Sequence, residues 1–375
     1  MDGQRKTIII GAGVIGLSIA WRLCRRGEQV LVLERGQTGQ EASRVAAGML
    51  AAAAEVGFEE PELYALCRAS LKRWPSFASE LEAESGMSLD YSSFGTLIVA
   101  DDRDATEALR RGYQFQKDQG YPVDWLSGAE ALEKEPFLSP RVVAAVSVPE
   151  DHSVDNRKLL QALVAAINAH GGDIREQTAV EHLDFSSKQI RVETAAGDIH
   201  EADRIVVAAG AWSAGISGLS EAIRPPVRPI KGQILELKMV DPFALNHVIR
   251  GPKAYLVPRK DGRLIVGATS EEMGFDRSIT VGAIHGILDG AWEVVPGILD
   301  QEILSIDVGF RPASRDHQPM VGFTADPRVF MATGHYRHGI VLSAVTATVS
   351  EQMLLDGSTD DVMTFFSPLR FDSPA

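Results

Sequence analysis

The sequence predicts an α/β fold in which a domain with a parallel sheet is interleaved with a second domain built on an antiparallel sheet. The apolar run Ile8–Ile10, a helical pattern over Val14–Arg25 and a second apolar run over Gln29–Leu33 form a βαβ unit at the start of the chain. A later apolar run over 204–209 leads into Gly210 and indicates a return to the same sheet. Between residues 225 and 309, strands alternate with turns, which favours an antiparallel sheet with one face over a cavity.

The turn between the first strand and the first helix carries glycines at positions 11, 13 and 16. Gly11 permits a tight turn, Gly13 lets the backbone approach a pyrophosphate, and Gly16 lets helix and strand pack closely. The helix N-terminus then directs free N–H groups at the phosphates. Glu34, at the end of the second strand, stands where an acid accepts hydrogen bonds from a ribose diol. A glycine turn alone is often only a turn. Here a strand precedes it, a helix and a second strand follow it, and an acid stands at the expected distance, so we predict dinucleotide binding. An acid at this position disfavours a 2′-phosphate, and both FAD and NAD stay open.

Composition argues against several classes of partner. The 375-residue chain has a formal net charge of −14, whereas nucleic acids and anionic membrane surfaces favour basic proteins. The longest apolar stretch of the early chain, 45–54, is too short to cross a bilayer. Cys24 and Cys67 are the two cysteines, and they make neither a disulfide framework nor a zinc site. We therefore expect a cytoplasmic protein with no nucleic-acid or membrane partner.

Other segments predict the elements that connect these units. An amphipathic helix is expected from residue 61 to 74, where Pro75 interrupts it before a second helical piece runs to Glu84. Asp155 is placed to cap a helix over 156–170. The remaining expected helices cover 104–119, 126–133, 281–295 and 340–355, and the remaining strands cover 93–100, 178–185, 189–194, 233–237, 254–258, 264–268, 303–309 and 329–332.

Small residues crowd the segment after Glu34 and include Ser43 and Ala46–Met49. Such a chain can run close to a flat ring system, or it can form a small-residue helix that packs on the first helix. The sequence leaves both interpretations open.

Seven motifs together resemble the FAD-dependent D-amino acid oxidase family, and within it most closely the glycine oxidases linked to thiazole formation in thiamine biosynthesis. The glycine turn and Val207–Ser213 are shared with many FAD proteins, whereas Tyr255, Arg311 and Arg337 narrow the likeness to amino-acid oxidases. The likeness covers almost the whole chain, and NAD is set aside on this resemblance. The motifs are Ile10–Gly16, Ala46–Leu50, Val207–Ser213, Tyr255–Lys260, Gly267–Thr269, Gly309–Pro312 and Gly334–Ile340.

The resemblance implies a non-covalent FAD. Sarcosine oxidases of similar fold attach the flavin through a late cysteine, and no cysteine follows Cys67. An uncapped helix beginning near Ile340 would favour negative charge on the flavin, although Gly339 could also be a plain turn before a helix. The expected FAD contacts are Gly11, Gly13, Val14, Ile15 and Gly16 at the phosphates, Glu34 and Arg35 at the ribose, Val180 at the adenine, Ala42, Ser43, Ala47, Gly48 and Met49 along the flavin, Gly210 beside the ligand, and Gly334, His335, Tyr336, His338, Gly339, Ile340 and Val341 at the pyrimidine edge.

The resemblance also implies how an amino acid would be held. Arg311 is similar to the carboxylate-binding arginine of the family, and a planar guanidinium suits that role. The alternative is a surface or flavin-contacting arginine. Tyr255 is expected to donate to the carboxylate or to form a pocket wall, and otherwise to be a core tyrosine. Arg337 matches a pocket position as a second contact or a gate. His335 and His338 have no third ligand in register, so no metal is expected.

The expected activity is oxidative deamination of glycine and small amines such as sarcosine and D-alanine, with oxygen as acceptor and hydrogen peroxide as a product. No side chain stands out as a general base, and none is required if the amine binds in its neutral form. Lys253 and Ser270 depart from the histidine and methionine familiar in glycine oxidases, and Ser270 could admit a larger or more polar amine. The alternatives are a D-amino acid or proline dehydrogenase that uses another electron carrier, and a non-catalytic flavin-binding protein.

The resemblance and the pattern of elements divide the chain into two discontinuous domains. A Rossmann-like FAD-binding domain is expected from 1–85, 148–222 and 308–375, and a substrate-binding domain from 86–147 and 223–307. The family suggests a homo-oligomer, a tetramer by analogy. It also suggests that the imine product is handed to a thiazole synthase.

Overall fold

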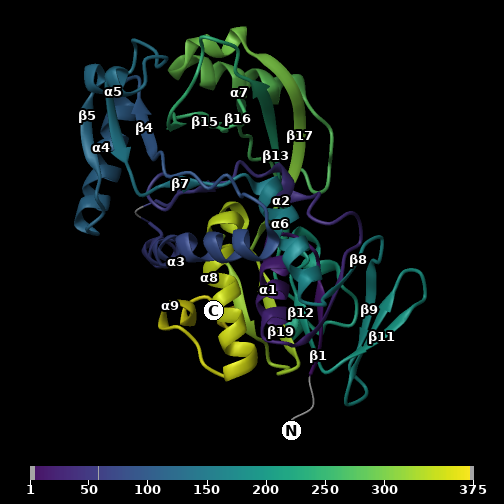
Figure 1. Ribbon diagram of the computed structural model, residues 1–375. Coiled ribbons are helices and arrows are strands. Elements are labelled where there is room, and N and C mark those ends of the chain that lie inside the picture. The colour runs from purple at the N-terminus through teal and green to yellow at the C-terminus, as the bar shows by residue number, and fades with distance from the viewer. Residues whose placement is uncertain (1–4, 58, 372–375) are drawn as a thin grey trace.

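The chain builds one mainly parallel and one mainly antiparallel large sheet, which occupy opposite halves of the molecule (Figure 1). The computed structural model describes residues 5–57 and 59–371. Helices cover the parallel sheet, and α7 (Val281–Val294) lies beside the antiparallel sheet. The predicted α/β class, with an antiparallel region interleaved in the chain, is therefore confirmed. The division into two domains at the expected boundaries stays a prediction.

The parallel sheet has six strands in the order β18-β19-β12-β1-β2-β8. All neighbours are parallel except β18 and β19, which pair antiparallel. Its central strands are continuous runs of Ile and Val because both faces are buried, as at Ile8, Ile9 and Val206. The strands are β1 (Lys6–Ile10), β2 (Gln29–Leu33), β8 (Asp173–Arg175), β12 (Arg204–Val207), β18 (Met320–Phe323) and β19 (Val329–Thr333).

Four helices form the core around this sheet. The first, α1 (Val14–Arg25), has the predicted bounds and packs on α6 (Asn156–Ala169) and α8 (Gly339–Glu351). The helix α3 (Pro61–Ser85) packs on α6 and α8 in turn. The predicted cap of α6 is confirmed, since the Asp155 carboxylate accepts from the N–H groups of Arg157 and Lys158. A π-helical turn, Gln352–Asp356, extends α8.

The predicted break at Pro75 is wrong, because α3 runs through it without interruption. Pro75 faces solvent, so the backbone hydrogen bond that it removes lies on the outer side of the helix. On the inner side, Trp74 and Phe77 are fully buried, and the Trp74 indole donates to the Val341 carbonyl of α8 at 2.8 Å. Packing of the inner face therefore holds the helix together across the proline.

The antiparallel sheet has eight strands in the order β17-β13-β16-β15-β14-β4-β6-β5, with one parallel pair between β14 and β4. Its two longest strands, β13 (Arg228–Lys238) and β17 (Glu302–Ala313), extend well beyond the predicted ranges. They form a ribbon that reaches from this sheet to the helices of the other half (Figure 1). The other strands are β4 (Thr96–Ala100), β5 (Asp124–Ser127), β6 (Ala144–Val148), β14 (Val248–Arg250), β15 (Tyr255–Pro258) and β16 (Arg263–Gly267). Two helices, α4 (Arg103–Asp118) and α5 (Gly128–Lys134), pack near the end of the sheet that β5 closes.

Smaller elements complete the fold. The small-residue segment forms a four-residue helix, α2 (Ala42–Val45), and then a short strand, β3 (Met49–Leu50), which pairs with β7 (His152–Ser153). A separate antiparallel sheet contains β9 (Val180–Asp184), β10 (Ile190–Thr194) and β11 (Ile199–Ala202), and a last short helix is α9 (Asp361–Thr364). Within the ranges that the structure covers, none of the helices has the length and apolarity needed to span a bilayer. Cys24 and Cys67 are free thiols, and burial raises the pKa of Cys24 to about 11.

Candidate active site

A cavity of about 590 Å³ lies where the β13–β17 ribbon meets the parallel sheet. Nearly every residue expected at the site lines it, including the three side chains expected to hold a substrate, Tyr255, Arg311 and Arg337. Gly16 and Gly334 do not line it and lie behind its wall. The fold thus brings together residues that are more than 300 positions apart in the chain.

The glycine turn has the tight geometry that its spacing predicts. Gly11 has a φ of +107°, and a side chain there would come within 2.5 Å of the Ala208 carbonyl oxygen. A Cβ on Gly16 would overlap the Gly11 carbonyl oxygen. The N–H of Leu17 donates to the Gly13 carbonyl at 2.9 Å, and this bond begins the α1 ladder. The N–H group of Ile15, which lines the cavity, has no partner among the described residues and stays available to a ligand, as at any helix N-terminus.

Glu34 is buried at the end of β2 and holds the turn in place. One carboxylate oxygen accepts from the Ala12 N–H at 2.8 Å, and the other accepts from the Gly36 N–H at 2.9 Å. The sequence predicted a ribose contact for Glu34. It did not predict that the carboxylate would link the end of β2 to the glycine turn through these two hydrogen bonds. Val180, at the start of β9, lines the same end of the cavity.

The small-residue segment lies against the cavity beside α1. The Ser43 hydroxyl accepts from the Val14 N–H at 2.9 Å, which fixes α2 to the first turn of α1. Arg259, which the sequence did not single out, supports the segment from behind by donating to the carbonyls of Ala47 and Val154 at 2.7 and 2.8 Å. Burial lowers the pKa of Arg259 to about 10.

The loop before α8 forms the opposite wall. Helix α8 begins at Gly339 with no side-chain cap, as predicted. His335 and His338 are buried, and burial lowers the pKa of both imidazoles to about 3, so both are neutral. His335 is within 3.1 Å of the Thr346 hydroxyl, and His338 accepts from the Arg337 Nε at 3.2 Å. Among the residues that the structure describes, no group of three His, Cys, Asp or Glu side chains is arranged to hold a metal.

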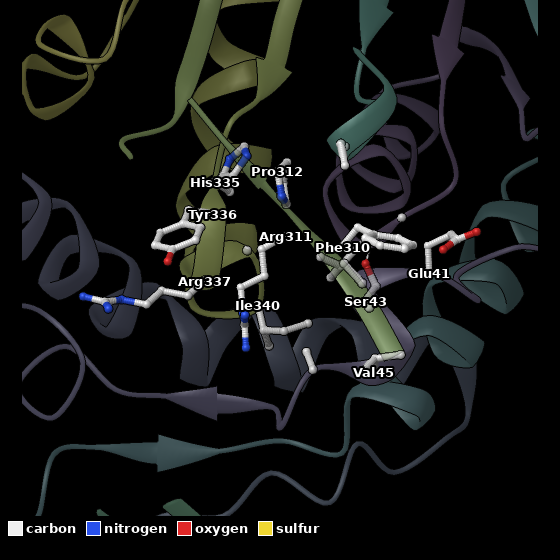
Figure 2. A pocket seen from close by; sticks show the side chains of 18 of the residues that line it. Glu41, Ser43, Val45, Phe310, Arg311, Pro312, His335, Tyr336, Arg337 and Ile340 are labelled. Carbon is white, nitrogen blue, oxygen red and sulfur yellow. Dashed lines mark hydrogen bonds between the residues drawn. The ribbon is translucent and has the colours of Figure 1, made fainter. Parts of the chain in front are cut away.

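Arg311 lies on β17 and points into the cavity below Phe310 and Pro312 (Figure 2). One of its Nη atoms donates to the Thr269 carbonyl at 2.9 Å. The guanidinium is also within hydrogen-bonding reach of the Tyr255 hydroxyl, and within the described chain no carboxylate pairs with it. The guanidinium lies over Gly232 of β13, where a Cβ would come within 2.6 Å of both Nη atoms. Arg311 therefore offers free donors to an anion.

Tyr255, at the start of β15, also lies over a glycine of the neighbouring strand. It pairs with Gly267 of β16, and a Cβ there would come within 2.5 Å of the tyrosine hydroxyl. Burial raises the pKa of this hydroxyl, and the neighbouring Arg311 opposes that shift. A neutral tyrosine beside a guanidinium can donate a second hydrogen bond to an anion held by Arg311.

Arg337 lines the cavity, but its guanidinium points in a different direction from that of Arg311 (Figure 2). It donates to the Glu55 carbonyl at 2.9 Å and lies 3.6 Å from the Glu60 carboxylate. Arg337 thus ties the loop before α3 to the loop before α8, and a direct substrate contact stays a prediction.

Lys253 and Ser270, the two positions that differ from the residues familiar in glycine oxidases, lie at the same end of the cavity as Tyr255 and Arg311. Lys253 lines the cavity, but its ammonium is turned away to the Glu293 carboxylate of α7 at 2.7 Å. The Ser270 hydroxyl is 3.4 Å from that of Tyr336. Only Ser270 therefore presents its polar group toward the loop that closes the site.

Sequence comparison identifies the group of proteins to which this architecture belongs. Residues 6–352 match the DAO family, described as FAD dependent oxidoreductase. The chain belongs to this family. It is similar to the bifunctional protein ThiO/ThiG of Trichormus variabilis, with 35% identity over 99% of this chain and 56% of that protein. The chain thus spans about half the length of such bifunctional relatives.

Shorter relatives of the DAO family match over nearly their full length. The glycine oxidase of Geobacillus kaustophilus is 34% identical over 92% of each chain. The crystal structure of glycine oxidase from Geobacillus kaustophilus superposes with a TM-score of 0.92 and 32% identity, covering 98% of both chains.

The cavity fits the FAD of this family. Gly11 and Gly16 have no space for a side chain, and the turn offers free N–H groups, as a pyrophosphate requires. Glu34 lies at one end of the lining, and the helix N-terminus at Gly339 lies at the other. FAD is thus the cofactor of this DAO-family chain.

A segment of the antiparallel region, residues 271–280, closes over the nucleotide end of the cavity. Phe275 stacks on Trp212 with ring centroids 4.9 Å apart, and the Arg35 guanidinium lies 3.5 Å from the Trp212 ring. Arg277 pairs with Glu41 at 2.6 Å. Fully buried Lys231 anchors the segment from below through Asp276 at 2.7 Å. Trp212, Arg35 and Glu41 all line the cavity, so this segment braces the wall around the FAD.

Phe275→Ala should weaken FAD binding by about three- to tenfold, because one aromatic pair contributes roughly 0.5–1.5 kcal/mol. Titration of the apoprotein with FAD, followed by quenching of flavin fluorescence, measures this effect directly. Phe365→Ala is the matched control, since Phe365 is 47% exposed and Phe275 is 46% exposed. Equal FAD affinity in both variants would show that the segment does not brace the cofactor.

Proposed function

We propose that the chain is an FAD-dependent oxidase of glycine and small amines such as sarcosine and D-alanine. The observation that carries the proposal is Arg311, whose guanidinium faces the cavity with no carboxylate partner in the described chain and with the Tyr255 hydroxyl beside it. A cation and a neutral hydroxyl at one point form a site for a carboxylate. Several relatives that match over nearly their full length are glycine oxidases, which supports an amino acid as the ligand.

In this proposal the protein contributes mainly orientation. Arg311 binds the substrate carboxylate, and the rigid β13–β17 ribbon keeps the guanidinium in place. Tyr255 donates its hydroxyl to the same carboxylate. When bound, FAD supplies the two-electron oxidation of the amine, and oxygen accepts the electrons to give hydrogen peroxide. Buried His335 and His338 stay neutral, so they add no charge to this wall.

The imine product is proposed to hydrolyse or to pass to a thiazole synthase. Support for the second fate comes from the fused ThiO/ThiG relatives, in which the matching region is joined to further sequence of comparable length. A cytoplasmic location, a tetrameric assembly and the expected domain boundaries belong to the same proposal.

The proposal is tested by adding glycine to the purified yellow protein without oxygen. Glycine should bleach the flavin absorbance, and readmitted oxygen should restore it with release of hydrogen peroxide. A flavin that neither glycine, sarcosine nor D-alanine bleaches would refute the proposal. Turnover with an artificial dye but almost none with oxygen would replace it with the dehydrogenase alternative.

A further inference from the structure

The loop between β3 and α3 carries an acid, Glu55, that faces the substrate end of the cavity. Its side chain is 12% exposed, and it lines the same cavity as Arg311 and Tyr255. Sequence reasoning did not single it out, because an acid in a loop before a helix is usually a solvated residue.

The backbone of this loop is held in place by buried groups. The Asp151 carboxylate, which is fully buried, accepts from the N–H groups of Ala52, Ala53 and Ala54 at 3.1–3.3 Å. Arg337 donates to the carbonyl of Glu55 itself at 2.9 Å. The position of Glu55 is therefore set by contacts from two other parts of the chain.

The Glu55 carboxylate has an ion-pair partner within the protein for only one of its two oxygens. Its Oε1 atom lies 3.1 Å from the Arg250 Nε, close enough for an ion pair, but the two groups are not aligned as a hydrogen bond. Its Oε2 atom has no partner among residues 5–57 and 59–371. One carboxylate oxygen is thus available to a ligand.

Glu55 differs in this respect from the other acids that line the cavity. Glu34 has both oxygens occupied by backbone N–H groups, and Glu41 is paired with Arg35 and Arg277. Both also lie at the nucleotide end. Glu55 lies instead at the end where Tyr255 and Arg311 meet.

Arg250, the ion-pair partner of Glu55, lies over the Tyr255 ring at 6.0 Å from its centroid, so Glu55 and Arg311 both lie close to Tyr255. The Arg311 guanidinium lowers the pKa of this hydroxyl, and the Glu55 carboxylate raises it. Both charges are therefore within electrostatic reach of one hydroxyl, with opposite signs. A zwitterionic amino acid carries a carboxylate, which is complementary to Arg311, and an ammonium, which is complementary to Glu55, on one carbon atom.

We propose that Glu55 binds the amino group of the incoming substrate as its ammonium form, before that group gives up a proton and reacts as the neutral amine, while Arg311 binds the carboxylate. The inference rests on the proposed function and deepens it, because it names what distinguishes an amino acid from a simple carboxylic acid at this site. An ammonium on the free Oε2 forms a charge-assisted hydrogen bond. Sarcosine satisfies the same contact, since its secondary ammonium keeps two N–H donors.

The test compares glycine with acetate, which has the carboxylate but no amino group, in the FAD-loaded wild type and in Glu55→Gln. The glycine Kd is measured from the saturation of anaerobic flavin bleaching, and the acetate Kd from the change in flavin absorbance on titration. Glu55→Gln should weaken glycine binding by about 10- to 100-fold and leave acetate binding within about threefold. Unchanged glycine affinity would overturn the proposal, and so would equal losses for both ligands.

Two further variants separate binding of the amine from structural support. Glu55→Asp keeps the charge and should bind glycine more tightly than Glu55→Gln does, and this comparison stands alone if Glu55→Gln fails to fold. Arg250→Met removes the internal partner of Glu55 and should retain glycine binding. A glycine loss in Arg250→Met as large as that in Glu55→Gln would mean that the ion pair, and not amine recognition, is the role of Glu55.

Failure of the proposed function gives a different result. If glycine does not bleach the wild type but sarcosine or D-alanine does, the same comparison is made with that amine and its matching carboxylic acid, acetate or propionate. Loss of selectivity for the amine in Glu55→Gln would then still support the role of Glu55.

Discussion

Arg311→Leu should lower kcat/KM for glycine by about a hundred- to a thousandfold, while the variant keeps its FAD. The substrate carboxylate would enter a cavity without its cation, and leaving a buried charge unpaired costs about 3–5 kcal/mol. Initial rates of hydrogen peroxide formation measure the loss, and the flavin spectrum reports that the cofactor stays bound. Unchanged kcat/KM would remove Arg311 from carboxylate binding.

Gly232→Ala provides a test that keeps the arginine. The new methyl group would come within 2.6 Å of the Arg311 Nη atoms, so the guanidinium must move although its charge stays. A loss of glycine affinity with intact FAD binding would show that the position of Arg311 matters, and not only its charge. Wild-type affinity in Gly232→Ala would argue against the fixed placement of this side chain.

Gly16→Ala should abolish FAD retention, with an affinity loss of at least about a hundredfold. The Cβ would overlap the Gly11 carbonyl oxygen, which is main chain and cannot swing aside as a side chain can. Alanine is otherwise the better helix former by about 1 kcal/mol, so a loss would come from this contact. The purified variant should be colourless, and titration with FAD measures its affinity.

Gly112→Ala is the matched control for Gly16→Ala. Gly112 lies inside α4, where nothing is within 4 Å of an added Cβ. This variant should keep FAD and unfold at a slightly higher temperature. A yellow Gly16→Ala protein with wild-type FAD affinity would contradict the steric argument.

The parts of the fold that the sequence predicts are those that depend on local pattern. Helix α1 has the expected bounds because its apolar residues, its glycine turn and its polar C-terminus agree. Asp155 caps α6 because a cap requires only its own helix. Pro75 misled the prediction because its effect depends on which side of α3 meets the core, which tertiary packing decides.

The parts of the candidate site that the sequence missed depend on contacts between distant segments. Gly232 acquires its role only through the register that sets Ile230 opposite Arg311 and Gly232 opposite Gly309. Arg250 and Glu55 are 195 positions apart and form a pair only once β14 and the loop before α3 are in place. No periodicity in a single sequence encodes such pairs, whereas the glycine turn and Arg311 belong to short motifs.

The strand order of the parallel sheet constrains when the cofactor site can exist during synthesis. Thr7 of β1 pairs with Arg204 of β12, and Ile205 of β12 pairs with Val329 of β19. Strand β1 therefore gains its second neighbour, β12, only after about half of the chain has been synthesised. The wall from His335 to Val341 emerges later still. Such non-local pairing slows folding, and the Ile- and Val-rich strand β12 stays without its β19 neighbour until residues 329–333 have been synthesised.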